Sequence, residues 1–269
     1  MGHPIAKHNA TTVGSGARTL VLGHGLGTDQ RIWRLLAPRL AVDHRVVLLD
    51  WVGSGRSAPL AFEPARYSSL QAHAEDLREL IRSLAAEPVT YIGHSAGAMI
   101  GVLAAIEEPQ LFEHLVLIAA SPRYLDDPPD YVGGSRREDI DALFALMDEN
   151  FLGWSSTFAA MAARDAALER ELEGIFRGND QRHLREFAEA ILLSDFRATL
   201  PRLRTPALVL GSTRDDMVPV AVNLYLHSAL TGSAYQCFDL AGHCPQMTHP
   251  SLVEGAIRSY LTRKFAPCG

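Results

Sequence analysis

The chain has 269 residues, a net charge of −6 and a hydrophobic content of 47%, which is enough for one large domain or two small ones with a substantial core. Its acidic and basic residues are interspersed, so the composition gives no electrostatic reason to expect binding to nucleic acid or to an anionic membrane. No apolar run approaches the roughly 20 residues of a membrane span, and the N-terminal segment lacks the apolar core of a secretory signal, so we expect a cytoplasmic protein.

Short apolar segments alternate with longer segments of helical periodicity. The apolar segments are residues 19–25, 45–51, 89–95, 114–121, 206–212 and 234–240. The first five are nearly continuous, as in strands that are covered on both faces. Helical spacing is found over residues 30–41, 68–86, 96–108, 221–230 and 251–264. This alternation predicts an α/β fold with a mostly parallel, doubly wound sheet.

One long stretch, residues 124–199, interrupts the alternation. It begins with a Pro/Asp/Gly-rich segment and continues with helical patterns that carry many large apolar residues. We interpret it as a helical lid over the carboxyl ends of the strands, where ligands bind in such sheets. The predicted organisation is a core formed by residues 1–123 and 200–269, with the lid formed by residues 124–199.

A possible nucleophile lies in the sequence Gly93-His94-Ser95-Ala96-Gly97, between a predicted strand and a predicted helix. Gly-x-Ser-x-Gly in that context is typical of a nucleophile elbow. The turn is sharp and strained, so glycine is needed where a side chain would collide with the neighbouring strand or helix. The helix N-terminus would direct positive charge density toward the reacting centre. An ordinary tight turn is the alternative, and the strand–turn–helix context disfavours it.

A serine nucleophile requires a base and an acid, and both have candidates late in the chain. His243 follows the last predicted strand, as the base of this type of site does. Asp215 and Asp216 both follow the preceding strand. The spacing Asp-x-x-Val-Pro favours Asp215 and leaves Asp216 as the alternative. The adjacent His94 is expected to point away from the nucleophile, and five other histidines are interpreted as surface or packing residues: His44, His73, His114, His183 and His227.

The oxyanion of the reaction requires backbone N–H donors. One is predicted on Ala96, directly after the nucleophile, and the other on Leu26 in the segment His24-Gly25-Leu26-Gly27. There is no phosphate-binding or dinucleotide-binding glycine motif and no metal-ligand spacing. The three cysteines, Cys237, Cys244 and Cys268, are too few and too unevenly spaced for a disulfide framework. We therefore expect neither a cofactor nor a metal.

Several longer motifs resemble the RsbQ-like subfamily of α/β-hydrolases, which includes the bacterial stress-signalling hydrolase and the plant karrikin and strigolactone receptors. The carrying segments are HGLGTDQRIW, RVVLLDWVGSGRS, RYSSL, GHSAGAMIG, SPRYLDDPPDYVGG, ENFLGW and GHCPQMTHP. The resemblance implies the α/β-hydrolase fold with a V-shaped lid of four helices inserted after the sixth strand. It also implies a triad of Ser95, His243 and Asp215.

The resemblance further implies a closed apolar pocket beneath the lid. Besides Leu26, the predicted pocket residues are Tyr124, Leu143, Trp154, Phe158, Phe196 and Met217. Two positions depart from the family pattern: Leu26 stands where phenylalanine is usual, and Ala96 where valine is frequent. Both changes enlarge the pocket or alter its shape.

Two functions follow from these residues. The first is hydrolysis of a small apolar ester, lactone or enol ether. The second is a ligand-gated signalling protein whose lid binds a protein partner and whose hydrolysis is slow or secondary. The partner would be a phosphatase in the bacterial branch and an F-box protein in the plant branch, where a nuclear location is also possible. Cofactor-free haloperoxidases and C–C hydrolases share the same triad and remain a third alternative.

Overall fold

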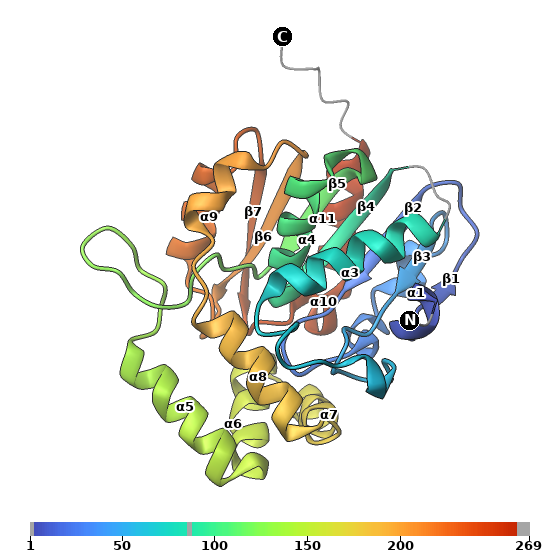
Figure 1. The fold of residues 1–269 in the computed structure, drawn as a ribbon. Helices are drawn as coiled ribbons and strands as arrows, with labels where there is room; N and C mark the ends of the chain where they lie inside the picture. The colour runs from blue at the N-terminus through green and yellow to red at the C-terminus, as the bar shows by residue number, and fades with distance from the viewer. Residues whose placement is uncertain (1–2, 85–87, 263–269) are drawn as a thin grey trace.

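The computed structural model describes residues 3–84 and 88–262, which form one seven-stranded sheet with helices on both faces and a helical lid at one end (Figure 1). The strand order is β1-β3-β2-β4-β5-β6-β7. All neighbours are parallel except β1 and β3. The strands are β1 (Thr11–Val13), β2 (Thr19–Gly23), β3 (Arg45–Leu48), β4 (Val89–His94), β5 (Phe112–Ile118), β6 (Ala207–Arg214) and β7 (Ala234–Ala241).

The central strands are the most apolar ones, as the sequence predicts for strands covered on both faces. Every residue of β2 and β4 is buried. Helix α3 crosses one face of the sheet with α4 beside it, whereas α11 lies behind the strands in Figure 1. The helices of the core are α1 (Pro4–Lys7), α2 (Ala37–Leu40), α3 (Leu70–Ser83), α4 (Ala96–Glu107), α9 (Val220–Ala229), α10 (Pro245–Thr248) and α11 (Pro250–Thr262). Short 3₁₀ helices are η1 (Gln30–Trp33), η2 (Pro59–Ala61), η3 (Pro109–Leu111) and η4 (Arg197–Arg202).

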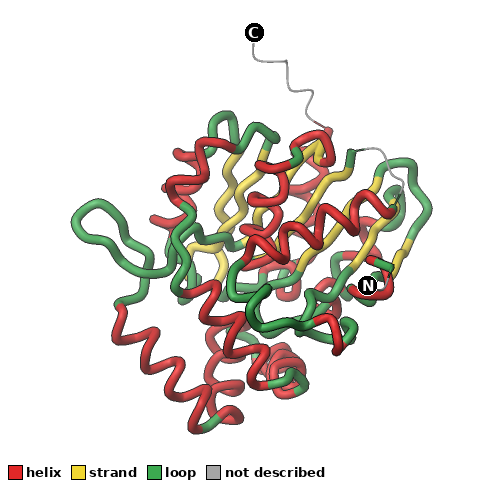
Figure 2. The backbone as a smooth tube through the Cα atoms, viewed as in Figure 1, coloured by secondary structure: helices red, strands yellow, loops and turns green. Residues whose placement is uncertain are grey.

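The predicted lid consists of four helices between β5 and β6: α5 (Arg137–Glu149), α6 (Phe151–Ala163), α7 (Ala166–Arg177) and α8 (Gln181–Leu192). They form a separate group of helices beyond the ends of the strands (Figure 2). The family resemblance implied a lid after the sixth strand, but in the structure the lid follows the fifth strand, β5. The reason is that only one short antiparallel strand, β1, precedes the parallel sheet in the described part of the chain.

The strand order brings the candidate catalytic loops together. Strands β2 and β4 are neighbours in the sheet, but the chain continues from β2 to β3 on one side and from β4 to β5 on the other. The carboxyl ends of β2 and β4 therefore border a topological switch point, where ligands bind in such sheets. Gly23 pairs with Gly93 across β2 and β4, which puts the predicted oxyanion loop beside the predicted elbow. On the other side, Arg214 of β6 pairs with Ala241 of β7, one residue before Asp215 and two residues before His243.

The six predicted strands are confirmed, and the structure differs from the sequence expectation mainly in the N-terminal region. The expected helix over residues 30–41 is divided into η1 and α2. Pro38 has no N–H group and is tolerated only in a first helical turn, so α2 begins at Ala37. Strand β1 was not predicted, because its three exposed residues give no apolar pattern. Parts of the helices expected over 68–86 and 251–264 lie outside the described residues, as does Cys268. None of the described helices has the length and apolarity to cross a membrane.

Candidate active site

Ser95 occupies a strained turn between β4 and α4, at φ 53° and ψ −120°. A non-glycine residue rarely adopts a positive φ, and such strain is typical of functional turns. The flanking glycines are required by close packing: a Cβ atom at Gly93 would lie 2.5 Å from the Cα of Ala98, and one at Gly97 would lie 2.4 Å from the backbone oxygen of His24. The small residues around Ser95 therefore have the steric cause that the sequence indicates.

His243 and Asp215 are hydrogen-bonded to each other and buried. The His243 Nδ1 atom lies 2.8 Å from Asp215 Oδ2. The other carboxylate oxygen, Oδ1, accepts hydrogen bonds from the backbone N–H groups of Met217 and Val218, at 2.8 and 3.1 Å. Asp216, the alternative acid, instead forms an ion pair with Arg164 at the surface. The Asp-x-x-Val-Pro spacing thus selects the carboxylate that contacts the histidine.

The surroundings of Asp215 favour its ionised form. Burial by itself raises the pKa of this carboxyl group, but the nearby His243 and the three hydrogen bonds to the carboxylate outweigh burial and hold its pKa below the usual range. An ionised acid in this position fixes the imidazole with Nδ1 as the donor, which leaves Nε2 free to accept a proton.

The backbone of His243 is held by the lid. Its N–H donates to the backbone oxygen of Ala162, near the end of α6, at 2.7 Å. The preceding Gly242 has a φ of +98°, and a Cβ atom there would lie 2.9 Å from the backbone oxygen of Ala163. The loop that carries the histidine therefore fits closely beneath α6.

The position of His94 next to Ser95 suggested that its side chain points away from the site, but the structure shows otherwise. Its Nε2 atom lies 3.0 Å from the backbone oxygen of His243, and the centroids of the two imidazole rings are 4.9 Å apart. Burial, followed by the neighbouring His243, lowers the pKa of His94 to about 3. Neutral His94 can therefore donate a hydrogen bond that supports the loop of His243.

The two backbone N–H groups predicted as oxyanion donors have no internal hydrogen-bond partner in the described part of the chain. Within the described residues, neither the Leu26 N–H nor the Ala96 N–H donates a hydrogen bond to the protein. Leu26 lies in the loop between β2 and η1, and Ala96 is the first residue of α4. Free donors at a helix N-terminus and in an adjacent glycine loop are the arrangement that stabilises developing negative charge.

Ser95 opens into a small apolar cavity of about 30 Å³. The predicted pocket residues Leu26, Tyr124, Phe158 and Met217 line it together with His243. The hydroxyl of Tyr124 lies 3.3 Å from Ser95 Oγ, and burial raises the pKa of this tyrosine to about 12, so it is present as a neutral hydroxyl. A second, larger groove of about 320 Å³ adjoins the cavity between α5 and α6. The two share the wall residues Tyr124, Phe158, Leu192 and Met217.

Three predicted pocket residues occupy other positions. Leu143 lines the outer groove and not the cavity. Trp154 is fully buried behind Phe158, whose ring it stacks against with centroids 4.9 Å apart, so it supports the wall without reaching the cavity. Phe196 lines neither space, because it lies at the base of the lid, where its N–H donates to the backbone oxygen of Pro122.

The sequence analysis missed several residues that line the cavity. They share small or apolar side chains and come mostly from lid helices and the histidine loop: Thr28, Ala162, Phe176, Ile191, Leu192 and Cys244. Helices α7 and α8 are both amphipathic, so their apolar faces were detectable. Which of those residues reach Ser95 depends on how the helices cross. Among the described residues, no group of three His, Cys, Asp or Glu side chains is arranged to hold a metal ion.

The fold and the residues around Ser95 define a class of enzyme, and comparison with known proteins agrees. Residues 18–250 match the family model of the α/β hydrolase fold, so the chain belongs to this family. A probable esterase of Oryza sativa subsp. japonica is 40% identical over 272 residues, covering 99% of this chain and 100% of the relative. A strigolactone esterase of Arabidopsis thaliana is 36% identical and covers 95% and 96% of the two chains.

A solved structure, the hydrolase olei00960 from Oleispira antarctica, superposes with a TM-score of 0.94 at 32% identity, covering 97% of each chain. Together with the plant relatives, this confirms the resemblance to the RsbQ-like subfamily that the longer sequence motifs indicated. The chain is a hydrolase that acts on ester-type bonds.

Proposed function

We propose that this enzyme cleaves a small, mainly apolar ester, lactone or enol ether through a triad of Ser95, His243 and Asp215. The observation that carries the proposal is the hydrogen bond between His243 and Asp215 at 2.8 Å, together with the fact that His243 and Ser95 line the same cavity. The strained backbone of Ser95 and the two free N–H groups beside it give independent support.

The chemistry follows from these positions. His243 removes the proton of Ser95 as Oγ forms a bond to the substrate carbonyl carbon, while the N–H groups of Leu26 and Ala96 bind the oxyanion. The bond to the leaving oxygen then breaks, and His243 gives the proton to that oxygen. Water attacks the acyl-enzyme with His243 again acting as the base, which releases the acid and restores Ser95.

The sizes of the two spaces support a substrate with a small reacting end and a larger apolar body. The cavity beside Ser95, at about 30 Å³, is far smaller than the roughly 300–1,000 Å³ of an ordinary ligand pocket. The groove between α5 and α6 is about ten times larger, and Ile140, Leu143 and Leu146 provide apolar surface there. We propose that the body of the substrate occupies this groove while the carbonyl group reaches Ser95.

The test is the hydrolysis of p-nitrophenyl acetate by Ser95→Ala, with Ser228→Ala on the exposed surface of α9 as the matched control. We expect the first variant to lose turnover by at least ~10³-fold and the control to behave as the wild type. A Ser95→Ala protein that folds and still forms acyl-enzyme or retains turnover would contradict the triad.

A second candidate function is ligand-gated signalling, with the lid as the surface for a protein partner. It is favoured by full-length relatives whose names denote receptors, such as the "Karrikin insensitive 2 receptor CA" of Petunia hybrida, which is 38% identical and covers 99% and 100% of the two chains. Candidate partners of the phosphatase and F-box classes can be tested by pull-down with and without ligand. Binding that requires ligand would favour the receptor, and no binding in either condition would favour the plain enzyme.

A further inference from the structure

The loop that carries the Leu26 N–H group is held firmly at its beginning by the core. The backbone oxygen of Gly25 accepts a hydrogen bond from the Thr28 hydroxyl at 3.0 Å. Trp51 holds His24 from both sides: its backbone N–H donates to His24 Nε2 at 3.0 Å, and its indole N–H donates to the His24 backbone oxygen at 2.7 Å. The residues before Leu26 therefore have a fixed position that does not depend on the lid.

The tip of the same loop is held by the lid. The backbone oxygen of Gly27 accepts a hydrogen bond from Asn179 Nδ2 at 2.8 Å. Within the described residues, this is the only hydrogen bond that reaches Leu26 or Gly27. Asn179 lies in the turn between α7 and α8, and the ring of Phe176 in α7 covers Gly27 so closely that a Cβ atom there would lie 2.8 Å from the ring.

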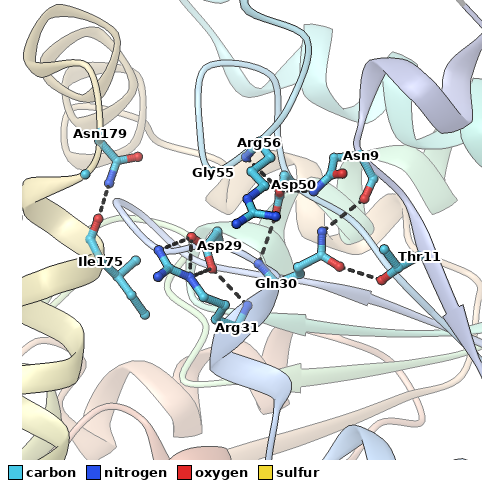
Figure 3. Close-up of a pocket in the computed structure, with 11 residues that line it drawn as sticks. Asn9, Thr11, Asp29, Gln30, Arg31, Asp50, Gly55, Arg56, Ile175 and Asn179 are labelled. Atoms are coloured by element: carbon cyan, nitrogen blue, oxygen red, sulfur yellow. Dashed lines mark hydrogen bonds and ion pairs between the residues drawn. The ribbon is translucent and has the colours of Figure 1, made fainter.

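The orientation of the Asn179 amide follows from its neighbours. Nδ2 also lies 3.0 and 3.2 Å from the backbone oxygens of Ile175 and Phe176 (Figure 3 shows the first of these bonds). Exchanging the amide nitrogen and oxygen would place the side-chain oxygen against three carbonyl oxygens, so the nitrogen must face Gly27. Oδ1 is buried and makes no hydrogen bond within the described residues. The contact with Gly27 therefore depends on a donor and not only on shape.

Glycine on both sides of Leu26 makes this contact important. Gly25 and Gly27 restrict the backbone very little, and Gly27 has a φ of +67°. The direction of the Leu26 N–H group is therefore set by the anchors on either side of it, one in the core and one in the lid. Because a misdirected donor binds the developing oxyanion less well, loss of either anchor should affect the transition state more than the ground state.

We propose that Asn179 is a positioning residue that completes the oxyanion hole only when α7 and α8 lie against the core. This inference rests on the proposed function, because it takes Leu26 as an oxyanion donor. Asn179 does not touch the cavity that contains Ser95, so its effect on catalysis must act through the loop. Movement of the lid would thereby change catalytic rate as well as access to the cavity.

The experiment compares two isosteric substitutions. Asn179→Leu removes the donor, and Asn179→Asp replaces it with a carboxylate that faces three carbonyl oxygens. Leucine is preferable to alanine because a polar cavity of about 560 Å³ adjoins Asn179 (Figure 3) and would supply water to a truncated side chain. Asn150→Leu is the matched control, since Asn150 caps α6 through Gly153 and is exposed, without contact with the loop of Leu26.

We expect Asn179→Leu to lower kcat for p-nitrophenyl acetate about 10-fold, and Asn179→Asp at least as much, with KM changed less than about 2-fold. Binding of an aryl trifluoromethyl ketone, which forms an oxyanion on Ser95, should weaken by the same factor as kcat/KM. The Asn150→Leu control should retain wild-type kcat. Circular dichroism would establish that all variants are folded.

Three results would overturn the inference: wild-type kcat in folded Asn179→Leu, an equal loss of kcat in Asn150→Leu, or a milder effect of Asn179→Asp than of Asn179→Leu. The last result would indicate that only the shape of the side chain matters. Failure of the proposed function is distinguishable, because it requires turnover by Ser95→Ala. If Ser95→Ala is inactive and Asn179→Leu is fully active, the triad stands and only the role of Asn179 is rejected.

Discussion

His73 offers a sharp test of how burial controls the acid stability of this protein. Its ring is fully buried in α3 among three aromatic side chains, with ring centroids 4.8 Å from Tyr67, 4.7 Å from Phe187 and 5.9 Å from Trp51. Neither ring nitrogen has a hydrogen-bond partner within the described residues. Burial, opposed only in part by Asp76, lowers the pKa of His73 from 6.5 to about 3.

The consequence for stability follows from proton linkage. Between pH 6.5 and pH 3, the unfolded chain binds a proton at His73 and the folded protein does not, so the free energy of unfolding falls as the pH decreases through this range. At pH 5 the pH is 1.5 units below the pKa of 6.5 that His73 has in the unfolded chain. At ~1.4 kcal/mol per unit, His73 lowers the free energy of unfolding at this pH by about 2 kcal/mol. At pH 8 it is close to zero.

His73→Phe removes the titrating group and keeps an aromatic ring. Its effect at pH 8 measures the packing change alone, so that value is the internal control. We expect the variant to gain about 2 kcal/mol relative to the wild type when the pH is lowered from 8 to 5. Urea unfolding followed by circular dichroism at both pH values measures this difference. An identical pH dependence in the two proteins would refute the reasoning that burial keeps His73 neutral.

Two further predictions concern the candidate site. Asp215→Asn should lower kcat for p-nitrophenyl acetate by about 10³–10⁴-fold. Asp216→Asn loses only its ion pair with Arg164, so its kcat should stay within about 2-fold of the wild type. If steady-state kinetics gave the larger loss for Asp216→Asn, Asp216 would be the catalytic acid. Met217→Ala should join the cavity to the outer groove, because Met217 belongs to the wall between them. It should therefore raise kcat/KM for p-nitrophenyl hexanoate relative to the acetate by about 10-fold, and an unchanged ratio of the two esters would exclude Met217 as the barrier.

The parts of this protein that local sequence patterns specify were predictable. Continuous apolar runs identify β2 and β4, and the glycines around Ser95 predict a turn that other residues could not form. The spacing Asp-x-x-Val-Pro distinguishes Asp215 from Asp216 because the loop geometry turns one carboxylate toward two backbone N–H groups. In each case the deciding interactions lie within a few residues along the chain.

The walls of the cavity depend on contacts between distant segments, which local patterns do not encode. Trp154 and Phe158 are one helical turn apart in α6 and both are large aromatic residues, yet only Phe158 reaches the cavity. Their roles are set by the rotation of α6 against α7, where Phe176 packs on both rings. The amide of Asn179 likewise has no local signature, because its partner at Gly27 is 152 residues away in the sequence.

The bond between the His243 N–H and the backbone oxygen of Ala162 has a consequence for how such enzymes can be recombined. Helix α6 supports the loop that carries a candidate catalytic side chain, so the lid does more than cover the cavity. A chimera that takes residues 124–199 from another chain changes the support of His243 together with the walls of the cavity. Its catalytic rate and its substrate preference should therefore change together.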